Sequence, residues 1–194
     1  VWKQFHDDLF FTDLLDVLNG EVDIGSSWRD DLKTAAILAG QSQSTLDLPK
    51  AFLWNIIVIE LLLTPKDDEK GETKKHLSDR AEAFLGWSGW WETEGFEEAI
   101  EKAWKKRVGF VHRADRQSIT LEDLFFTDNL VLNLFVNIIE EIERFDCKEA
   151  IIEFSRKLEA ERILGQEPSV RPNTLRIVRP SFSEDDFEKT SYYR

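Results

Sequence analysis

The sequence predicts an all-α helical bundle with an irregular C-terminal extension. Residues that break helices are scarce, with nine glycines and five prolines among 194 residues, and three of those prolines fall after residue 165. Apolar residues recur at helical spacing over most of the chain. This length and a charged fraction of 32% suit one globular domain. We expect that domain over 29–164, an N-terminal helix within 1–28, and the extension over 165–194.

The first two helices are predicted from apolar spacing and from the residues that bound it. One helix spans Trp2–Leu18 and ends at Asn19-Gly20. Because the sequence starts with valine rather than methionine, we expect this helix to derive from a longer chain. The second helix spans Trp28–Ala39, with Ser26-Ser27 as its N-cap and Gly40 as its stop.

A third and a fourth helix follow. Gln41–Asp47 is a polar loop, and the third helix carries a proline in its first turn, at position 49, and runs to position 63. This helix is apolar nearly all round, which predicts a central place in the bundle. The charged run Thr64–Glu72 indicates a loop, and the fourth helix is expected over Thr73–Leu85.

An aromatic cluster breaks the fourth helix. Its three tryptophans are Trp87, Trp90 and Trp91. Such a cluster is more often a packed corner than a ligand cage. A fifth helix is predicted over Thr93–Val111.

The clearest helix start in the sequence is at Thr120. Thr120 and Asp123 have the spacing of a capping box, and apolar residues then recur at helical spacing to about Phe145. Another amphipathic helix is expected over Lys148–Leu164. Within the extension, Leu175–Val178 predicts a short strand.

One stretch of this acidic chain is basic. The formal net charge is −13, yet residues 102–116, here called the basic island, hold six Lys or Arg and one acid, a local charge of +5. The six are Lys102, Lys105, Lys106, Arg107, Arg113 and Arg116. The overall acidity argues against a protein that coats nucleic acids, because such binding needs cations that neutralise phosphates. Any contact with RNA is therefore expected at the basic island.

Several kinds of chemistry have no support in the sequence. A single cysteine, Cys147, excludes an internal disulfide and a cysteine-based zinc site, and no group of acids and histidines has metal-ligand spacing. His6 and His76 are expected at the surface. We therefore expect no metal and no cofactor. The single cysteine fits a reducing setting, so we expect a cytoplasmic protein. The longest apolar run is too short to cross a bilayer, so we expect no membrane contact.

The order of these motifs resembles the HEPN superfamily, and most closely the Apea-like HEPN domain. A charged helix ends in Arg-x-x-x-x-His within Ala103–His112, and the next helix opens with the Thr-Leu-Glu-Asp-Leu of Ile119–Leu124. The apolar helix Phe52–Leu63 with one embedded glutamate, and the segment His76–Phe84, are also similar to that family. The similarity covers Arg29–Phe145.

The resemblance implies a helical bundle that dimerises and, in many members, cleaves RNA without a metal. Carried onto this chain, its motif names Arg107 and His112 as catalytic residues, contributed by both protomers to one cleft. It also implies a prokaryotic defence or toxin–antitoxin setting. The RNA-binding residues would be Lys105, Lys106, Arg113 and Arg116.

The residue types fit that chemistry. The 2′-hydroxyl of RNA can attack the adjacent phosphate if one group accepts its proton and another protonates the leaving oxygen. Histidine suits both tasks, since its unperturbed pKa is about 6.5, and arginine grips phosphate through two donors. One protomer supplies one such histidine, so a two-fold dimer would supply the second.

Two acids have candidate supporting roles. Asp115 could orient the imidazole of His112, or pair with a neighbouring arginine. Glu60 lies in a nearly apolar helix, where an unpaired carboxylate is costly, so it should have a partner. Arg80 and Arg107 are the candidates, and a structural ion pair is the more common outcome than a catalytic glutamate.

A different class of function competes with RNA cleavage. Active relatives commonly have a polar residue directly after the motif arginine, and here it is Val108. Inactive HEPN domains serve as dimerisation or protein-interaction modules, and an acidic surface would dock the partner. A sensor of small molecules built on the tryptophan cluster is a third hypothesis. Ion pairs between the basic island and the chain's own acids would favour the interaction module.

Overall fold

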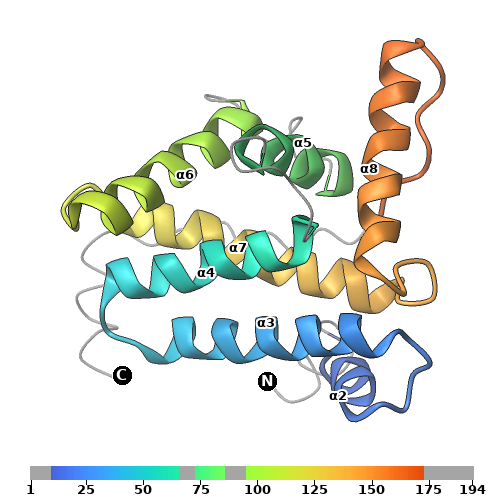
Figure 1. Ribbon diagram of the computed structural model, residues 1–194, viewed down its shortest axis with the longest axis horizontal. Coiled ribbons are helices and arrows are strands. Elements are labelled where there is room, and N and C mark those ends of the chain that lie inside the picture. Colours follow the sequence, from blue (N-terminus) through green and yellow to red (C-terminus); the bar gives the residue numbers. More distant parts are fainter. Residues whose placement is uncertain (1–9, 66–72, 86–94, 173–194) are drawn as a thin grey trace.

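The computed structural model describes residues 10–65, 73–85 and 95–172, and within them the chain forms seven helices and no strand (Figure 1). The predicted all-α bundle is confirmed. The helices are α2 (Phe11–Asn19), α3 (Ser26–Ser44), α4 (Leu48–Leu63), α5 (Thr73–Leu85), α6 (Phe96–Arg113), α7 (Leu121–Glu140) and α8 (Lys148–Ile163).

Helices α4 and α7 lie side by side at the centre of the bundle. Helix α3 packs along α4 on one side, and α2 contacts α3 and α7 (Figure 1). On the other side, α5 and α6 pack against each other and against α4, while α8 packs on α5 at one end. Every described helix therefore contacts α4, α7 or a helix that does.

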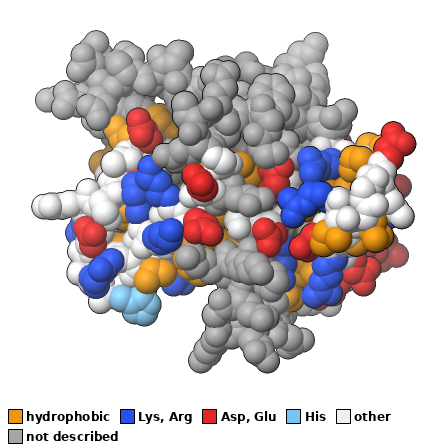
Figure 2. All heavy atoms as spheres, turned by 90° about the horizontal axis from the view of Figure 1, so that it is seen from above, with side chains coloured by type: hydrophobic (Ala, Val, Ile, Leu, Met, Phe, Trp, Pro, Cys, Tyr) orange, Lys and Arg blue, Asp and Glu red, His pale blue; other side chains and the backbone are white. Residues whose placement is uncertain are grey.

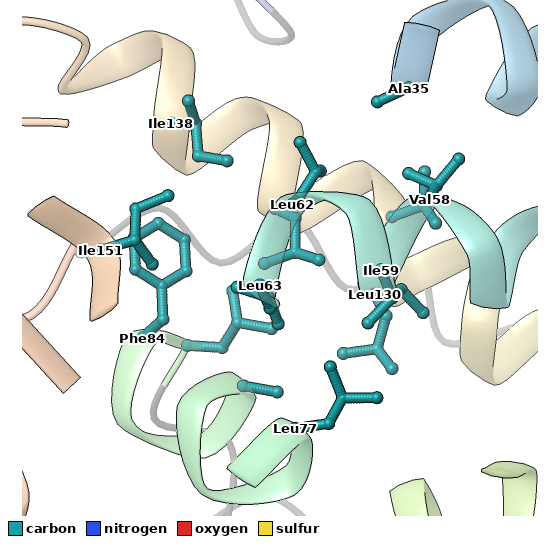
Figure 3. Close-up of a cluster of buried hydrophobic side chains, with 14 of the residues drawn as sticks. Ala35, Val58, Ile59, Leu62, Leu63, Leu77, Phe84, Leu130, Ile138 and Ile151 are labelled. Carbon is teal, nitrogen blue, oxygen red and sulfur yellow. The ribbon is translucent and has the colours of Figure 1, made fainter. Parts of the chain in front are cut away.

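The hydrophobic core surrounds α4, as its all-round apolar sequence predicts. Leu62 and Leu63 have no exposed side-chain surface. Figure 3 shows α4 side chains meeting apolar side chains from α3, α5, α7 and α8. Because α4 contacts α3, α5, α6, α7 and α8, it fixes the position of the elements around it.

Five predicted helix boundaries agree closely with the structure: both ends of α4, both ends of α5 and the start of α7. Asp47 caps α4 by accepting a hydrogen bond from the Lys50 backbone N–H at 3.2 Å, and Pro49 lies in the first turn. Helix α4 ends at Leu63, as predicted, and α5 has the predicted bounds. Thr120 and Asp123 form the predicted capping box at the start of α7.

The predicted boundaries of the second helix are wrong at both ends. Helix α3 includes Ser26, and its N-cap is Gly25 without a side-chain hydrogen bond. The helix also continues through Gly40 to Ser44. Ser42 explains the longer C-terminus, because it is buried against α4 and its hydroxyl donates to the Ala51 carbonyl at 3.0 Å. Tertiary contact with α4 outweighs the weak helix propensity of glycine here.

Helix α7 ends at Glu140, five residues before the predicted end near Phe145. The chain leaves the helix through hydrogen-bonded turns that place Phe145 in the core, 1% exposed. Its ring packs edge-on against Phe84 of α5 and Phe154 of α8, with centroid distances of 5.1 and 5.8 Å. The Phe145 carbonyl accepts a hydrogen bond from the Trp28 indole of α3 at 3.0 Å.

After α8 the chain turns back along that helix. Gly165 adopts a left-handed conformation, with φ of 64°, at the turn. The Ser169 backbone N–H and hydroxyl both donate to the Glu161 carboxylate at 2.7 Å. Arg144 donates to the Val170 carbonyl at 2.9 Å. Residues 165–172 thus form an ordered return segment without helix or strand.

Some predicted features lie outside the described residues. They are the first part of the helix Trp2–Leu18, the histidine His6, most of the loop Thr64–Glu72, the side chain of His76, the cluster Trp87, Trp90 and Trp91, the start of the helix Thr93–Val111, and the strand Leu175–Val178.

Candidate functional site

The basic island occupies the end of α6 and the connection to α7. Helix α6 continues two residues past its predicted end, so His112 and Arg113 lie in its last turn. Ala114 then takes a left-handed conformation, with φ of 54°. Its N–H donates to the Phe110 carbonyl at 3.0 Å, and the N–H of Asp115 donates to the Gly109 carbonyl at 3.4 Å. The α6 end, the α7 start and the α3–α4 connection meet at this corner.

Lys106 connects α6 to the capping box of α7. Its ammonium donates to Asp123, and the two side chains are 18% and 11% exposed. The same Asp123 carboxylate accepts hydrogen bonds from the Thr120 backbone N–H and hydroxyl at 2.7 and 2.8 Å. Lys106 therefore forms an ion pair with an acid that is also part of the N-terminal capping box of α7.

Arg107 pairs with Glu60 of α4, one of its two predicted partners. The Arg107 Nε to Glu60 Oε1 distance is 3.4 Å. Both atoms are buried, yet neither has a hydrogen bond within the described residues, so the pair is Coulombic in character. The guanidinium also lies 5.1 Å from the centre of the Trp104 ring. Arg80, the other candidate, instead donates to the Leu63 carbonyl at 3.1 Å.

The environment of Glu60 makes its ionisation less favourable than in water. Burial raises the pKa of Glu60 above its ordinary value, and the positive charge of Arg107 opposes that shift without cancelling it. The ion pair therefore only partly offsets the cost of removing this carboxylate from water.

Two further cations of the island pair with acids at the surface. Arg116 donates to Asp47 at 2.7 Å, and this hydrogen bond lowers the pKa of the aspartate. Lys105 lies 3.3 Å from Glu101, one helical turn earlier. On the face drawn in Figure 2, described Lys and Arg side chains lie among Asp and Glu side chains without an uninterrupted basic area. The local positive charge is thus largely compensated by the fold.

His112 and Arg113 differ from the rest of the island. Both are exposed, and neither has an ion pair or side-chain hydrogen bond within the described residues. The neighbouring Val111 is 50% exposed. Asp115, the candidate partner of His112, accepts a hydrogen bond from the Ser118 backbone N–H at 3.3 Å and so shapes the connection to α7.

Within the part of the chain that the structure describes, the Arg-x-x-x-x-His motif supplies one imidazole for RNA cleavage. Arg107 and His112 are five residues apart, about 140° around the helix, so their side chains point in different directions. A single imidazole cannot act as base and acid in one step. No group of three or more acids, histidines or cysteines among the described residues could hold a metal ion.

Three residues of this corner were not anticipated from the sequence as partners of the island. They are Asp47, Asp123 and Trp104. The i, i+3 spacing of Trp104 and Arg107 on one helix was the signal for their contact. Asp47 and Asp123 are both N-cap region acids, and only the packing of α4 and α7 against α6 brings them to the island.

No described helix is long and apolar enough to cross a membrane. No family model, curated protein or solved structure matches this chain.

Proposed function

We propose that this chain is a HEPN-like helical interaction module, in which the basic island joins helices and does not cleave RNA. The observation that supports this function is the pairing of four island cations with the chain's own acids. These pairs are Lys105–Glu101, Lys106–Asp123, Arg107–Glu60 and Arg116–Asp47.

Such pairing reduces what the island offers to RNA. Affinity for phosphates comes from cations that release counterions when they bind. A cation already paired with a carboxylate must lose that partner before it can hold a phosphate. For Arg107 the loss would also leave Glu60 as a partly buried, unpaired charge.

The test is an RNA cleavage assay combined with a stability measurement. Labelled single-stranded RNAs are incubated with the wild type, Arg107→Ala and His112→Ala, with chelator present. We expect no cleavage by any of the three. We also expect Arg107→Ala to lower the unfolding temperature, while His112→Ala leaves it unchanged because His112 is exposed. Cleavage by the wild type that both substitutions abolish would refute the interaction module.

Metal-independent RNA cleavage by a cytoplasmic homodimer is the second candidate function. Its support is that His112 and Arg113 are exposed and have no side-chain partner among the described residues. A two-fold axis at the α6 end would bring two imidazoles together. This candidate requires a dimer in sedimentation experiments and weaker RNA binding by Arg113→Gln; a monomer that does not bind RNA would exclude it. A role in defence or toxin–antitoxin systems belongs to this candidate.

A further inference from the structure

A groove lies at the other end of α7, between α2 and the turns that follow Glu140. Its volume is about 520 Å³. Twenty residues of α7, about 30 Å of helix, separate this end from the capping box at Thr120. The groove is therefore a separate surface from the basic island.

The floor of the groove is apolar, and hydrogen bonds from Arg29 fix the side formed by α2 and the residues after it. The apolar lining residues are Phe10, Val17, Val22, Ile139 and Ile142. Arg29 of α3 fixes the α2 side by donating to the carbonyls of Val17 and Val22 at 3.1 and 2.8 Å. The shape of the groove is therefore set by hydrogen bonds within the fold.

The rim of the groove is strongly acidic. Its acids are Asp13, Asp16, Glu140, Glu141 and Glu143. Arg144 also lines the groove, but its guanidinium pairs with Glu141 at 2.7 Å and donates to the Val170 carbonyl. Within the described residues, Asp16, Glu140 and Glu143 have no ion pair. The groove thus offers uncompensated negative charge above an apolar floor.

We propose that this groove docks a basic amphipathic peptide segment of a partner protein. Lysine or arginine side chains would meet the acidic rim, and aliphatic side chains would cover the floor. RNA is excluded as an occupant because the rim would repel its phosphates. A metal ion is disfavoured because no three acids, histidines or cysteines of the described residues converge to hold one. The pocket volume is in the range that buries a few side chains.

This inference rests on the proposed function, since it names the partner surface of the interaction module. The two can fail separately. Observed RNA cleavage would refute the proposed interaction module. The proposal for the groove depends only on whether the groove binds the peptide.

The test measures binding of a fluorescent twelve-residue peptide with leucine and lysine at helical spacing. The groove variant carries Asp16→Asn, Glu140→Gln and Glu143→Gln. The control carries Glu153→Gln, Glu159→Gln and Glu167→Gln, which change the net charge equally at exposed positions of α8 and the return segment. Circular dichroism checks that both variants are folded.

We expect the groove variant to bind about tenfold more weakly than the wild type, because three rim pairs of about 0.5 kcal/mol are lost. The control should stay within twofold. If both variants bind the peptide equally weakly, the peptide is attracted by the overall acidity of the chain and not by the groove, and the proposal is overturned. Absence of peptide binding by the wild type would also overturn it. If the groove variant does not fold, Glu143→Lys replaces it, with Glu153→Lys as its control and the same outcomes.

Discussion

At the scale of single residues, the structure assigns different roles to neighbours within one basic stretch. Lys106 and Arg107 reach inward to acids on other helices, whereas His112 and Arg113 face outward. Local charge in the sequence cannot distinguish these roles, because the partner acids are distant along the chain. Glu60 was the exception, since an acid in an apolar helix needs a partner wherever it lies.

The burial of Glu60 makes stability depend on pH. Because the folded-state pKa of Glu60 is raised, the folded protein holds its proton more tightly than the unfolded chain does. Stability contributed by this group is therefore largest below the unfolded value of 4.5 and falls as the pH rises through the folded pKa.

Replacing Arg107 should enlarge this effect. Arg107→Met removes the positive charge that stabilises ionised Glu60, so we expect a loss of about 1 kcal/mol at pH 7.5. The loss should shrink as the pH falls below 4.5, where Glu60 is protonated in both variants. Urea unfolding at both pH values measures the difference, with Glu60→Gln/Arg107→Met as control. A loss of equal size at both pH values would contradict the assigned role of the pair.

At the scale of elements, the sequence predicted a helix end correctly where a local residue determines it, and incorrectly where packing against another helix determines it. The capping box at Thr120 and the stop at Gly20, with φ of 86°, are local. The continuation of α3 through Gly40 depends on burial of Ser42 against α4, and the sequence carries no local sign of it.

The two glycines should respond to alanine in opposite directions. A Cβ at Gly40 would meet no atom within 4 Å, and the residue is exposed in a helix interior. We expect Gly40→Ala to raise stability by about 0.5–1 kcal/mol. Gly20→Ala should lower it by about 1 kcal/mol, since alanine is strained at positive φ. Chemical denaturation compares them. Destabilisation by Gly40→Ala would show that α3 does not continue through this position.

At the scale of the whole molecule, the fold class and the central place of α4 followed from the sequence, whereas the arrangement at the candidate site did not. Helical period and all-round apolarity are properties of one segment. The meeting of α6 with Asp47 and Asp123 depends on how three segments pack, and that information is not contained in any one of them.

Phe145 tests the assembly of the whole bundle. Its ring contacts α5 and α8, and its carbonyl is bound by α3. We expect Phe145→Ala to lower the free energy of unfolding by about 3–5 kcal/mol. Thermal and urea unfolding measure the loss, and Ile163→Ala, at a residue 73% exposed, is the control. A loss below 1 kcal/mol would place Phe145 outside the core.

The shared carboxylate of Asp123 has a consequence for motion. One acid caps the first turn of α7 and also binds Lys106 in the middle of α6, so loss of that first turn would also release Lys106. Amide protons on both sides of the connection should then exchange with solvent through a common opening event, as one cooperative unit.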